Sequence, residues 1–109
     1  MSTTTERIRA LNDQLRTSLE GGTVMLTRGI VALGPQKKAA ILAAVRRFDT
    51  FTSANDSYEE HDLGLLEVAG ERVMFKIDYY DRSLSVHSPD PSDPKVTTRV
   101  LTIMLADEY

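Results

Sequence analysis

Histidine and acidic side chains, which can hold metal ions and move protons, gather in one stretch of the sequence, between Tyr58 and Pro94. This stretch contains both histidines of the chain. Because imidazole and carboxylate groups that converge can bind a ligand through several hydrogen bonds, we take it as the candidate binding site. Its candidate binding residues are Glu60, His61, Asp62, Asp78, Tyr80, Asp81 and His87.

These residue types allow two kinds of catalysis. Imidazole with carboxylates suits zinc, manganese or iron, and such a metal could activate water for hydrolysis. Without a metal, His61 oriented by Asp78 could act as an acid–base pair. The spacing matches no named ligand motif, and no nucleophile-elbow motif surrounds the nearby serines. The simpler interpretation is that these groups bond loop backbone or face water. We therefore assign no catalytic residue, expect no cofactor and leave metal binding open.

A β-hairpin is the element that must position this cluster. Residues 72–80 alternate between apolar and polar side chains, which is typical of a half-buried antiparallel strand, and residues 63–68 supply its partner. A two-residue loop of Ala69 and Gly70 would pair His61 with Asp78, but it needs Ala69 at positive φ. A three-residue loop with Gly70 as a bulge would pair Glu60 with Asp78. We favour the second because it spares alanine that conformation; both predict the cluster beside Asp78.

The first half of the chain predicts a helix, a strand and a second helix. A threonine cap at Thr3–Thr5 precedes apolar residues at helical spacing, and Gly21-Gly22 ends the helix. Residues 23–27 have strand composition, and residues 30–33 either continue that strand or leave it. Gly34-Pro35 opens the second helix. The first helix has its stripe at Ile8, Leu11, Leu15 and Leu19, with Arg7, Asn12, Asp13 and Arg16 on the other side; the second has Ile41, Leu42, Val45 and Phe48.

The second half begins with a polar loop over residues 50–62, of the kind that is often functional or mobile. After the hairpin we expect a short strand around Leu84 and Val86. Asp93 before Pro94 is typical of a helix start, and Val100, Leu101, Met104 and Leu105 have helical spacing. Thr97, Thr98, Thr102 and Ile103 are β-branched and mildly favour a strand. The cap and the spacing decide for a helix.

These elements predict a single α+β domain over residues 1–109, with three helices packed on a small antiparallel sheet. The expected order is helix, strand, helix, hairpin or meander, helix. One sheet face should be covered and the other open, with Tyr79 on the core side and Tyr80 on the open side. The predicted core is Leu11, Leu15, Ile41, Leu42, Val45, Phe48, Val73, Phe75, Ile77, Val100, Leu101 and Leu105.

Composition narrows the class of protein. The 109 residues include no cysteine, which fits a reducing compartment. The first residues lack the apolar core of a signal peptide, and no apolar run reaches the roughly 20 residues of a membrane span. The net charge of −3 argues against nucleic-acid binding, although Lys37, Lys38, Arg46 and Arg47 make one helix face basic. We expect a cytoplasmic protein that binds another protein, a second copy of the chain included.

Several segments resemble a known family. They are Arg9-Ala10-Leu11-Asn12, Phe48-Asp49-Thr50-Phe51, Glu60-His61-Asp62, Lys76-Ile77-Asp78-Tyr79-Tyr80-Asp81, Ser88-Pro89-Asp90-Pro91 and Thr98 to Ala106. The sequence resembles a family of small bacterial proteins labelled only as a domain of unknown function, often encoded on plasmids and other accessory DNA. The resemblance implies a single-domain, cytoplasmic bacterial protein and transfers no functional residue.

Two functions follow as hypotheses. The first is a small protein-interaction or regulatory module that binds through the open sheet face and the loops at residues 58–62 and 81–91. The alternative is a small metal-dependent or acid–base hydrolase that uses His61, Asp78 and His87. An enzyme needs those three side chains to converge in a pocket, whereas a binding module needs only an exposed face.

Overall fold

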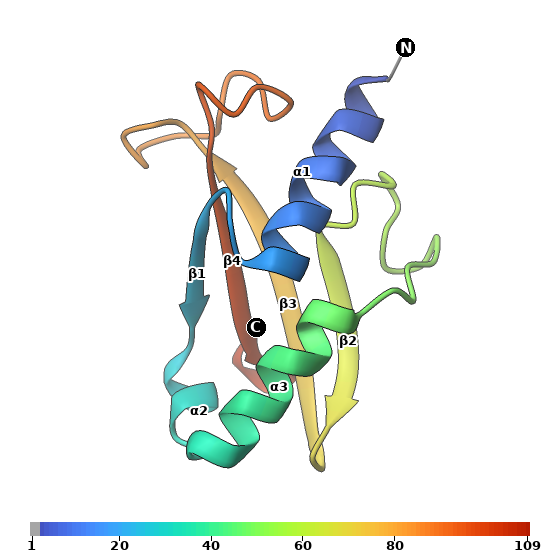
Figure 1. The fold of residues 1–109 in the computed structure, drawn as a ribbon, viewed down its shortest axis with the longest axis vertical. Coiled ribbons are helices and arrows are strands. Elements are labelled where there is room, and N and C mark those ends of the chain that lie inside the picture. Colours follow the sequence, from blue (N-terminus) through green and yellow to red (C-terminus); the bar gives the residue numbers. More distant parts are fainter. Residues whose placement is uncertain (1–2) are drawn as a thin grey trace.

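A computed structural model describes residues 3–109 as a four-stranded sheet with two long helices across one face (Figure 1). Met1 and Ser2, which belong to the segment that argued against a signal peptide, lie outside these residues. The helices are α1 (Thr4–Ser18), α2 (Arg28–Val31) and α3 (Pro35–Arg47), and a 3-10 turn, η1 (Ala106–Glu108), follows the last strand. The strands are β1 (Thr23–Leu26), β2 (Leu63–Val68), β3 (Glu71–Tyr80) and β4 (Thr98–Leu105).

The two long helices form where the sequence predicts them. The Thr3 hydroxyl caps α1 by accepting a hydrogen bond from the backbone N–H of Glu6 at 3.1 Å. Pro35 stands in the first turn of α3, where its missing N–H has no partner to lose. Ile8 and Leu15 of α1 and Ile41 of α3 are buried against the sheet. Helical periodicity therefore identified the apolar faces of both helices correctly.

The C-terminal segment, predicted as a helix, is the strand β4. It lies between β1 and β3 in the strand order β1-β4-β3-β2, parallel to β1 and antiparallel to β3. The sheet is therefore mixed, and the predictions of a third long helix and of a purely antiparallel sheet are wrong. β-Branched residues favour the extended chain, and a strand enclosed on both sides buries residues on both faces, which gives spacing that resembles a helical stripe.

The segment between β3 and β4 is a pair of turns. The predicted short strand at Leu84 and Val86 is absent, because both side chains are exposed and the chain turns around Asp81. This segment pairs with the end of β3 through a single antiparallel bridge between Tyr80 and His87. Asp93 accepts a hydrogen bond from the Lys95 N–H at 2.9 Å, so its carboxylate closes a turn rather than starting a helix.

The hairpin takes the register that we did not favour. Val68 pairs with Glu71 and Glu67 with Arg72, which leaves a two-residue loop. Ala69 has φ 53° and Gly70 has φ 80°, so both loop residues adopt the left-handed conformation. Such a turn matches the right-handed twist of the two strands, and this match outweighs the strain at alanine.

The strain at Ala69 gives a stability prediction. Ala69→Gly should raise the free energy of unfolding by about 0.5–1 kcal/mol, because glycine adopts positive φ without a steric penalty. The matched control is Ala39→Gly on the exposed side of α3, which should lower it by about the same amount. Urea denaturation of the three proteins measures both changes, and equal destabilisation by the two substitutions would contradict the turn geometry.

The two faces of the sheet differ. Val73, Phe75, Ile77, Leu101 and Ile103 face α1 and α3 and form the core, which Leu15, Ile30, Ile41 and Val45 complete. Of the predicted core, Leu11, Leu42, Phe48 and Leu105 are only half-buried, and Val100 lies on the opposite face of the sheet. Ile103 and Ile30 belong to the core and were not predicted. The opposite face has no long helix (Figure 1). None of the helices in residues 3–109 has the length and apolar character that a membrane span requires.

Candidate functional site

His61 lies against α1 instead of beside Asp78. Its Nδ1 is 2.9 Å from Oδ1 of Asp13, and since a carboxylate only accepts, Nδ1 carries the proton. The imidazole stacks on the Phe51 ring, with the two centroids 3.9 Å apart and the planes 5° apart. His61 also has φ 57°, so the chain leaves the direction of β2 at this residue. The ring is thus fixed by α1 on one edge and by the loop on one face.

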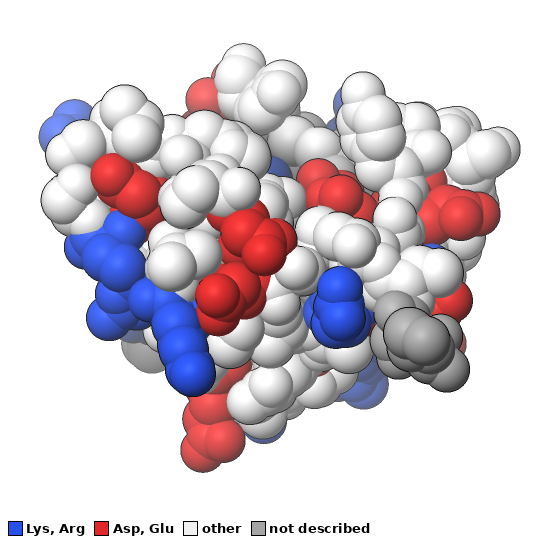
Figure 2. Space-filling view, turned by 90° about the horizontal axis from the view of Figure 1, so that it is seen from above, with Lys and Arg blue, Asp and Glu red and all other residues white. Residues whose placement is uncertain are grey.

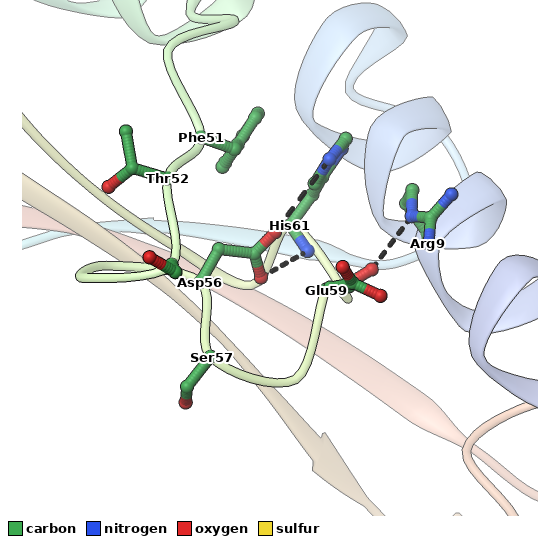
Figure 3. Close-up of a pocket in the computed structure, with 8 residues that line it drawn as sticks. Arg9, Phe51, Thr52, Asp56, Ser57, Glu59 and His61 are labelled. Carbon is green, nitrogen blue, oxygen red and sulfur yellow. Dashed lines mark hydrogen bonds and ion pairs between the residues drawn. The ribbon is translucent and has the colours of Figure 1, made fainter.

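Asp56 holds the other side of His61 (Figure 3). Its Oδ1 accepts a hydrogen bond from the His61 backbone N–H at 3.0 Å, and its Oδ2 is 3.7 Å from His61 Nε2. The Asp56 side chain is 5% exposed, so this carboxylate is nearly buried. Burial of a charge is costly unless polar groups compensate it, and here the His61 backbone N–H does so at Oδ1.

A polar pocket opens beside these groups (Figure 3). It has a volume of about 320 Å³. Its lining combines one basic, two acidic and three hydroxyl side chains with the two stacked rings. The residues are Arg9, Asp56, Glu59, Thr52, Ser53, Ser57, Phe51 and His61. Arg9 projects from α1, and its Nε donates to the Glu59 carbonyl at 2.7 Å. The pocket therefore lies at the junction of α1 with the loop at residues 50–62.

Beneath this junction, α1 is joined to the sheet by a buried hydrogen-bond network. Asn12 donates from Nδ2 to the Tyr79 hydroxyl at 2.7 Å and accepts at Oδ1 from Arg99 Nε at 2.9 Å. Tyr79 in turn donates to Oε1 of Glu60 at 2.8 Å. Burial raises the pKa of the Tyr79 phenol, and it lowers the pKa of the Arg99 guanidinium. Tyr79 therefore stays neutral and serves as a hydrogen-bond relay.

Arg16 ties α1 to the end of α3. Its Nη1 donates to the Phe48 carbonyl at 2.6 Å, and its Nη2 pairs with Asp13 at 3.0 Å. The guanidinium also lies 5.3 Å from the centre of the Phe51 ring. Asn12 and Arg16 were expected on the exposed side of this helix, and both are buried. Phe51 and the end of α3 cover Arg16, whereas Asn12 faces the sheet.

Several predicted site residues have separate partners. Glu60 accepts from Tyr79, whereas Asp78 pairs with Lys76 at 2.8 Å on the helix-free face. Asp81 closes its own turn by accepting from the Ser85 N–H at 2.8 Å, and these turn hydrogen bonds lower the pKa of its carboxyl. Tyr80 lies in β3 beside the single bridge to His87. The predicted residues therefore form local pairs.

His61 and His87 take different neighbours. His87 contacts the Ser88 carbonyl at 2.9 Å and lies edge-on to the Tyr79 ring, 6.2 Å between centroids. His61 contacts Asp13, Asp56 and Phe51. Within residues 3–109, no three histidine, aspartate or glutamate side chains are grouped so that they could hold a metal ion. His61, Asp78 and His87 share no contact that would support a second, hydrolytic function.

Asp62 carries a carboxyl whose ionised form is disfavoured. Burial raises its pKa, and the nearby carboxylates of Glu60, Asp56 and Asp78 add to the rise. A carboxyl whose pKa is raised in the folded state stabilises the fold at acidic pH. This contribution to the free energy of unfolding is lost as the pH rises through the folded-state pKa. Asp62→Asn should therefore raise the free energy of unfolding at pH 7 by about 0.5 kcal/mol, since the half-exposed carboxyl is screened by water. Urea denaturation at pH 7 and at about pH 3 measures it, and the gain should vanish at the lower pH.

Sequence reasoning missed three residues that build the site: Arg9, Asp13 and Asp56. Arg9 and Asp13 lie four residues apart on α1, which places them on one side of the helix. That side is also the one that Arg16 occupies. The loop at residues 50–62 gave no periodic signal, so nothing in the sequence assigned Asp56 to His61.

Charges at the loop end of the molecule are mixed. Figure 2 looks onto the end that lies uppermost in Figure 1, and basic side chains gather at its left while acidic ones are scattered across it. A phosphate backbone is usually met by a continuous basic surface. This end of the molecule offers no such surface.

Comparisons with known proteins identify a family. The family model described as "Protein of unknown function (DUF3768)" matches residues 26–108. The match starts after α1, so it does not cover Arg9, Asn12 or Asp13. No curated protein and no solved structure matches the chain.

Proposed function

The chain thus belongs to the DUF3768 family of proteins of unknown function, and we propose that it is a cytoplasmic protein-interaction module that regulates its partner. The partner binds the helix-free face of the sheet. We define this face by the residues that register places opposite the core: Thr23 and Met25 of β1, Val100, Thr102 and Met104 of β4, Arg72, Met74, Lys76, Asp78 and Tyr80 of β3, and Leu63, Leu65 and Glu67 of β2.

Exposed apolar side chains on this face carry the proposal. Met25 is 53% exposed and Leu65 is 51% exposed, although each lies in a regular strand. They stand on opposite edges of the sheet, with the Lys76–Asp78 ion pair between them. Methionine and tyrosine are enriched in protein interfaces, and charged groups among them give specificity. The composition of the face supports a protein partner.

Two hollows beside Arg72 add shape to the face. One has a volume of about 300 Å³ and lies among Leu65, Leu66, Glu67, Arg72, Val73 and Ala106. The other, of about 290 Å³, lies between the start of β3 and η1. A partner side chain can fill either hollow, and such filled pockets supply much of the energy in protein interfaces. The exposed loop residues Tyr58, Leu84 and Val86 lie outside this face.

The test compares partner recovery by variants of the full chain. Met25→Arg with Leu65→Arg should reduce the partner recovered from the native cell by at least about tenfold, because two charges would be buried in the contact. The matched control is Leu84→Arg, which places the same charge on a side chain that is 58% exposed in the turn after β3. Quantitative mass spectrometry of the captured proteins measures the recovery.

Stability must be matched before the result is interpreted. All three positions are exposed, so each variant should unfold within about 0.5 kcal/mol of the wild type. Equal recovery of the same proteins by the double variant and the wild type contradicts the proposal. If Leu84→Arg alone reduces the recovery of the partner, the partner binds the turns after β3 and the proposal is contradicted.

A further inference from the structure

In the pocket beside His61, one oxygen of the Asp56 carboxylate can accept a hydrogen bond from a ligand. Asp56 is nearly buried, and Oδ1 is satisfied by the His61 backbone N–H. Oδ2 makes no hydrogen bond to any of the residues 3–109, and it lies 3.7 Å from His61 Nε2. A distance of 3.7 Å exceeds that of a hydrogen bond. Because Asp56 lines the pocket, a group that enters it and donates to Oδ2 can form a charge-assisted hydrogen bond there.

The geometry around Oδ2 selects a group with more than one N–H. With its proton on Nδ1, which faces Asp13, the neutral tautomer of His61 has a lone pair at Nε2. Two acceptors 3.7 Å apart can both be reached, at about 2.8 Å each, by one nitrogen that lies between them. A hydroxyl has a single hydrogen and can satisfy only one of them, whereas an ammonium can donate to both.

The pocket also offers a cation for an anionic group. Arg9 lines it and uses Nε for the Glu59 carbonyl, and it forms no ion pair with a carboxylate within residues 3–109. The remaining guanidinium N–H groups can hold a carboxylate, a pairing that arginine favours because its donors form a planar fork. The hydroxyls of Ser53 and Ser57 supply further hydrogen bonds.

We propose that this pocket binds a small zwitterion of the amino-acid type, with its ammonium between Asp56 and His61 and its carboxylate on Arg9. The volume of about 320 Å³ suits a small molecule at the lower end of ligand pockets. The site lies on the opposite side of the sheet from the proposed partner face, so it stands independently of that function. It gives the protein a ligand that its interaction face does not require.

NMR titration of the full chain with each of the common free amino acids tests the proposal. At least one should bind saturably, and the shifted signals should include the His61 ring and the amides of Asp56 and Ser57. Methylammonium and acetate are the probes for the two halves of the ligand. Each should bind at least about tenfold more weakly than the amino acid, because it makes only one of the two charged contacts.

Two variants test which residue binds the ammonium and which binds the carboxylate of the ligand. Asp56→Asn should weaken the amino acid by at least about tenfold and should weaken methylammonium too, while its side-chain oxygen still accepts from the His61 N–H. Arg9→Gln should weaken the amino acid and acetate but not methylammonium. Asp49→Asn, on an exposed residue outside the pocket, is the control and should change nothing.

The proposal is overturned by the absence of saturable binding for every amino acid. It is also overturned if Asp56→Asn and Asp49→Asn bind alike, or if methylammonium alone binds as tightly as the amino acid. Failure of Asp56→Asn to fold leaves Arg9→Gln as the deciding variant, since Arg9 lies outside the core and its substitution should keep the fold.

Discussion

Replacing Phe75 by alanine is expected to lower the free energy of unfolding by about 3–5 kcal/mol. Phe75 is fully buried in the centre of the sheet, and its ring lies edge-on to Phe48 and Phe51 at centroid distances of 5.3 and 6.4 Å. A Cβ added at Gly64 would overlap with this ring, so the packing around it is tight. The loss combines removal of apolar burial with an unfilled cavity.

The measurement is denaturant unfolding, and the matched control is Tyr58→Ala. Tyr58 is 76% exposed, so removal of this aromatic ring should change the free energy of unfolding by less than about 0.5 kcal/mol. A second expected effect of Phe75→Ala is a looser Phe51, and hence faster amide exchange in the loop at residues 50–62. Similar stabilities for the two variants would show that the core is not centred on Phe75.

Replacing Asn12 by alanine should cost about 3 kcal/mol, a large effect for a polar residue on a helix. Asn12 is fully buried and satisfies three groups: the Glu60 carbonyl, the Tyr79 hydroxyl and Arg99 Nε. Alanine would leave a buried guanidinium N–H and a buried carbonyl without partners. Since these bonds join α1 to β3, to β4 and to the loop, their loss also weakens the attachment of the helix.

The control for Asn12→Ala is Gln14→Ala on the same helix. Gln14 is exposed, and the substitution should leave the free energy of unfolding within about 0.5 kcal/mol of the wild type. Thermal or urea unfolding distinguishes the two variants. If Asn12→Ala is as stable as Gln14→Ala, the network contributes nothing to the docking of α1.

Local signals in the sequence predicted the elements that depend on local physics. The cap at Thr3 and the spacing of Ile8 and Leu15 specify α1, and Pro35 with Ile41 specifies α3. The same periodicity put Asn12 and Arg16 on the polar side, but both are buried, and Asn12 lies on the face of α1 that carries Ile8 and Leu15 and bonds to the sheet. A polar residue gives no local sign of such burial, because its partners come from distant segments of the chain.

The C-terminal strand shows where local signals compete. Asp93-Pro94 has the composition of a helix start, but aspartate closes turns by the same side-chain hydrogen bond. Strand β4 is the centre of the sheet and pairs with β1 from the other end of the chain. Such a long-range parallel pairing leaves no local mark, apart from the β-branched residues that the prediction outweighed.

Of the seven predicted binding residues, His61 lines the pocket and the other six do not. The His61 ring contacts Asp13 on α1 instead of Asp78 on β3. The positive φ of Glu59 and His61 turns the chain away from the sheet before β2 begins. A sequence pattern for strands cannot anticipate this turn, because neither residue is glycine or asparagine.

The central claim is that the helix-free face of the sheet binds a protein, and methionine methyl NMR tests it most directly. Met25 is exposed on that face, and Met74 and Met104 are buried within it. With methyl-labelled methionine and isoleucine in the full chain, addition of clarified native-cell lysate should shift or broaden these three signals. The signals of Ile8 and Ile41, which α1 and α3 bury against the other face of the sheet, should stay unchanged. Unchanged methionine signals, or changes confined to the isoleucines, would contradict the account.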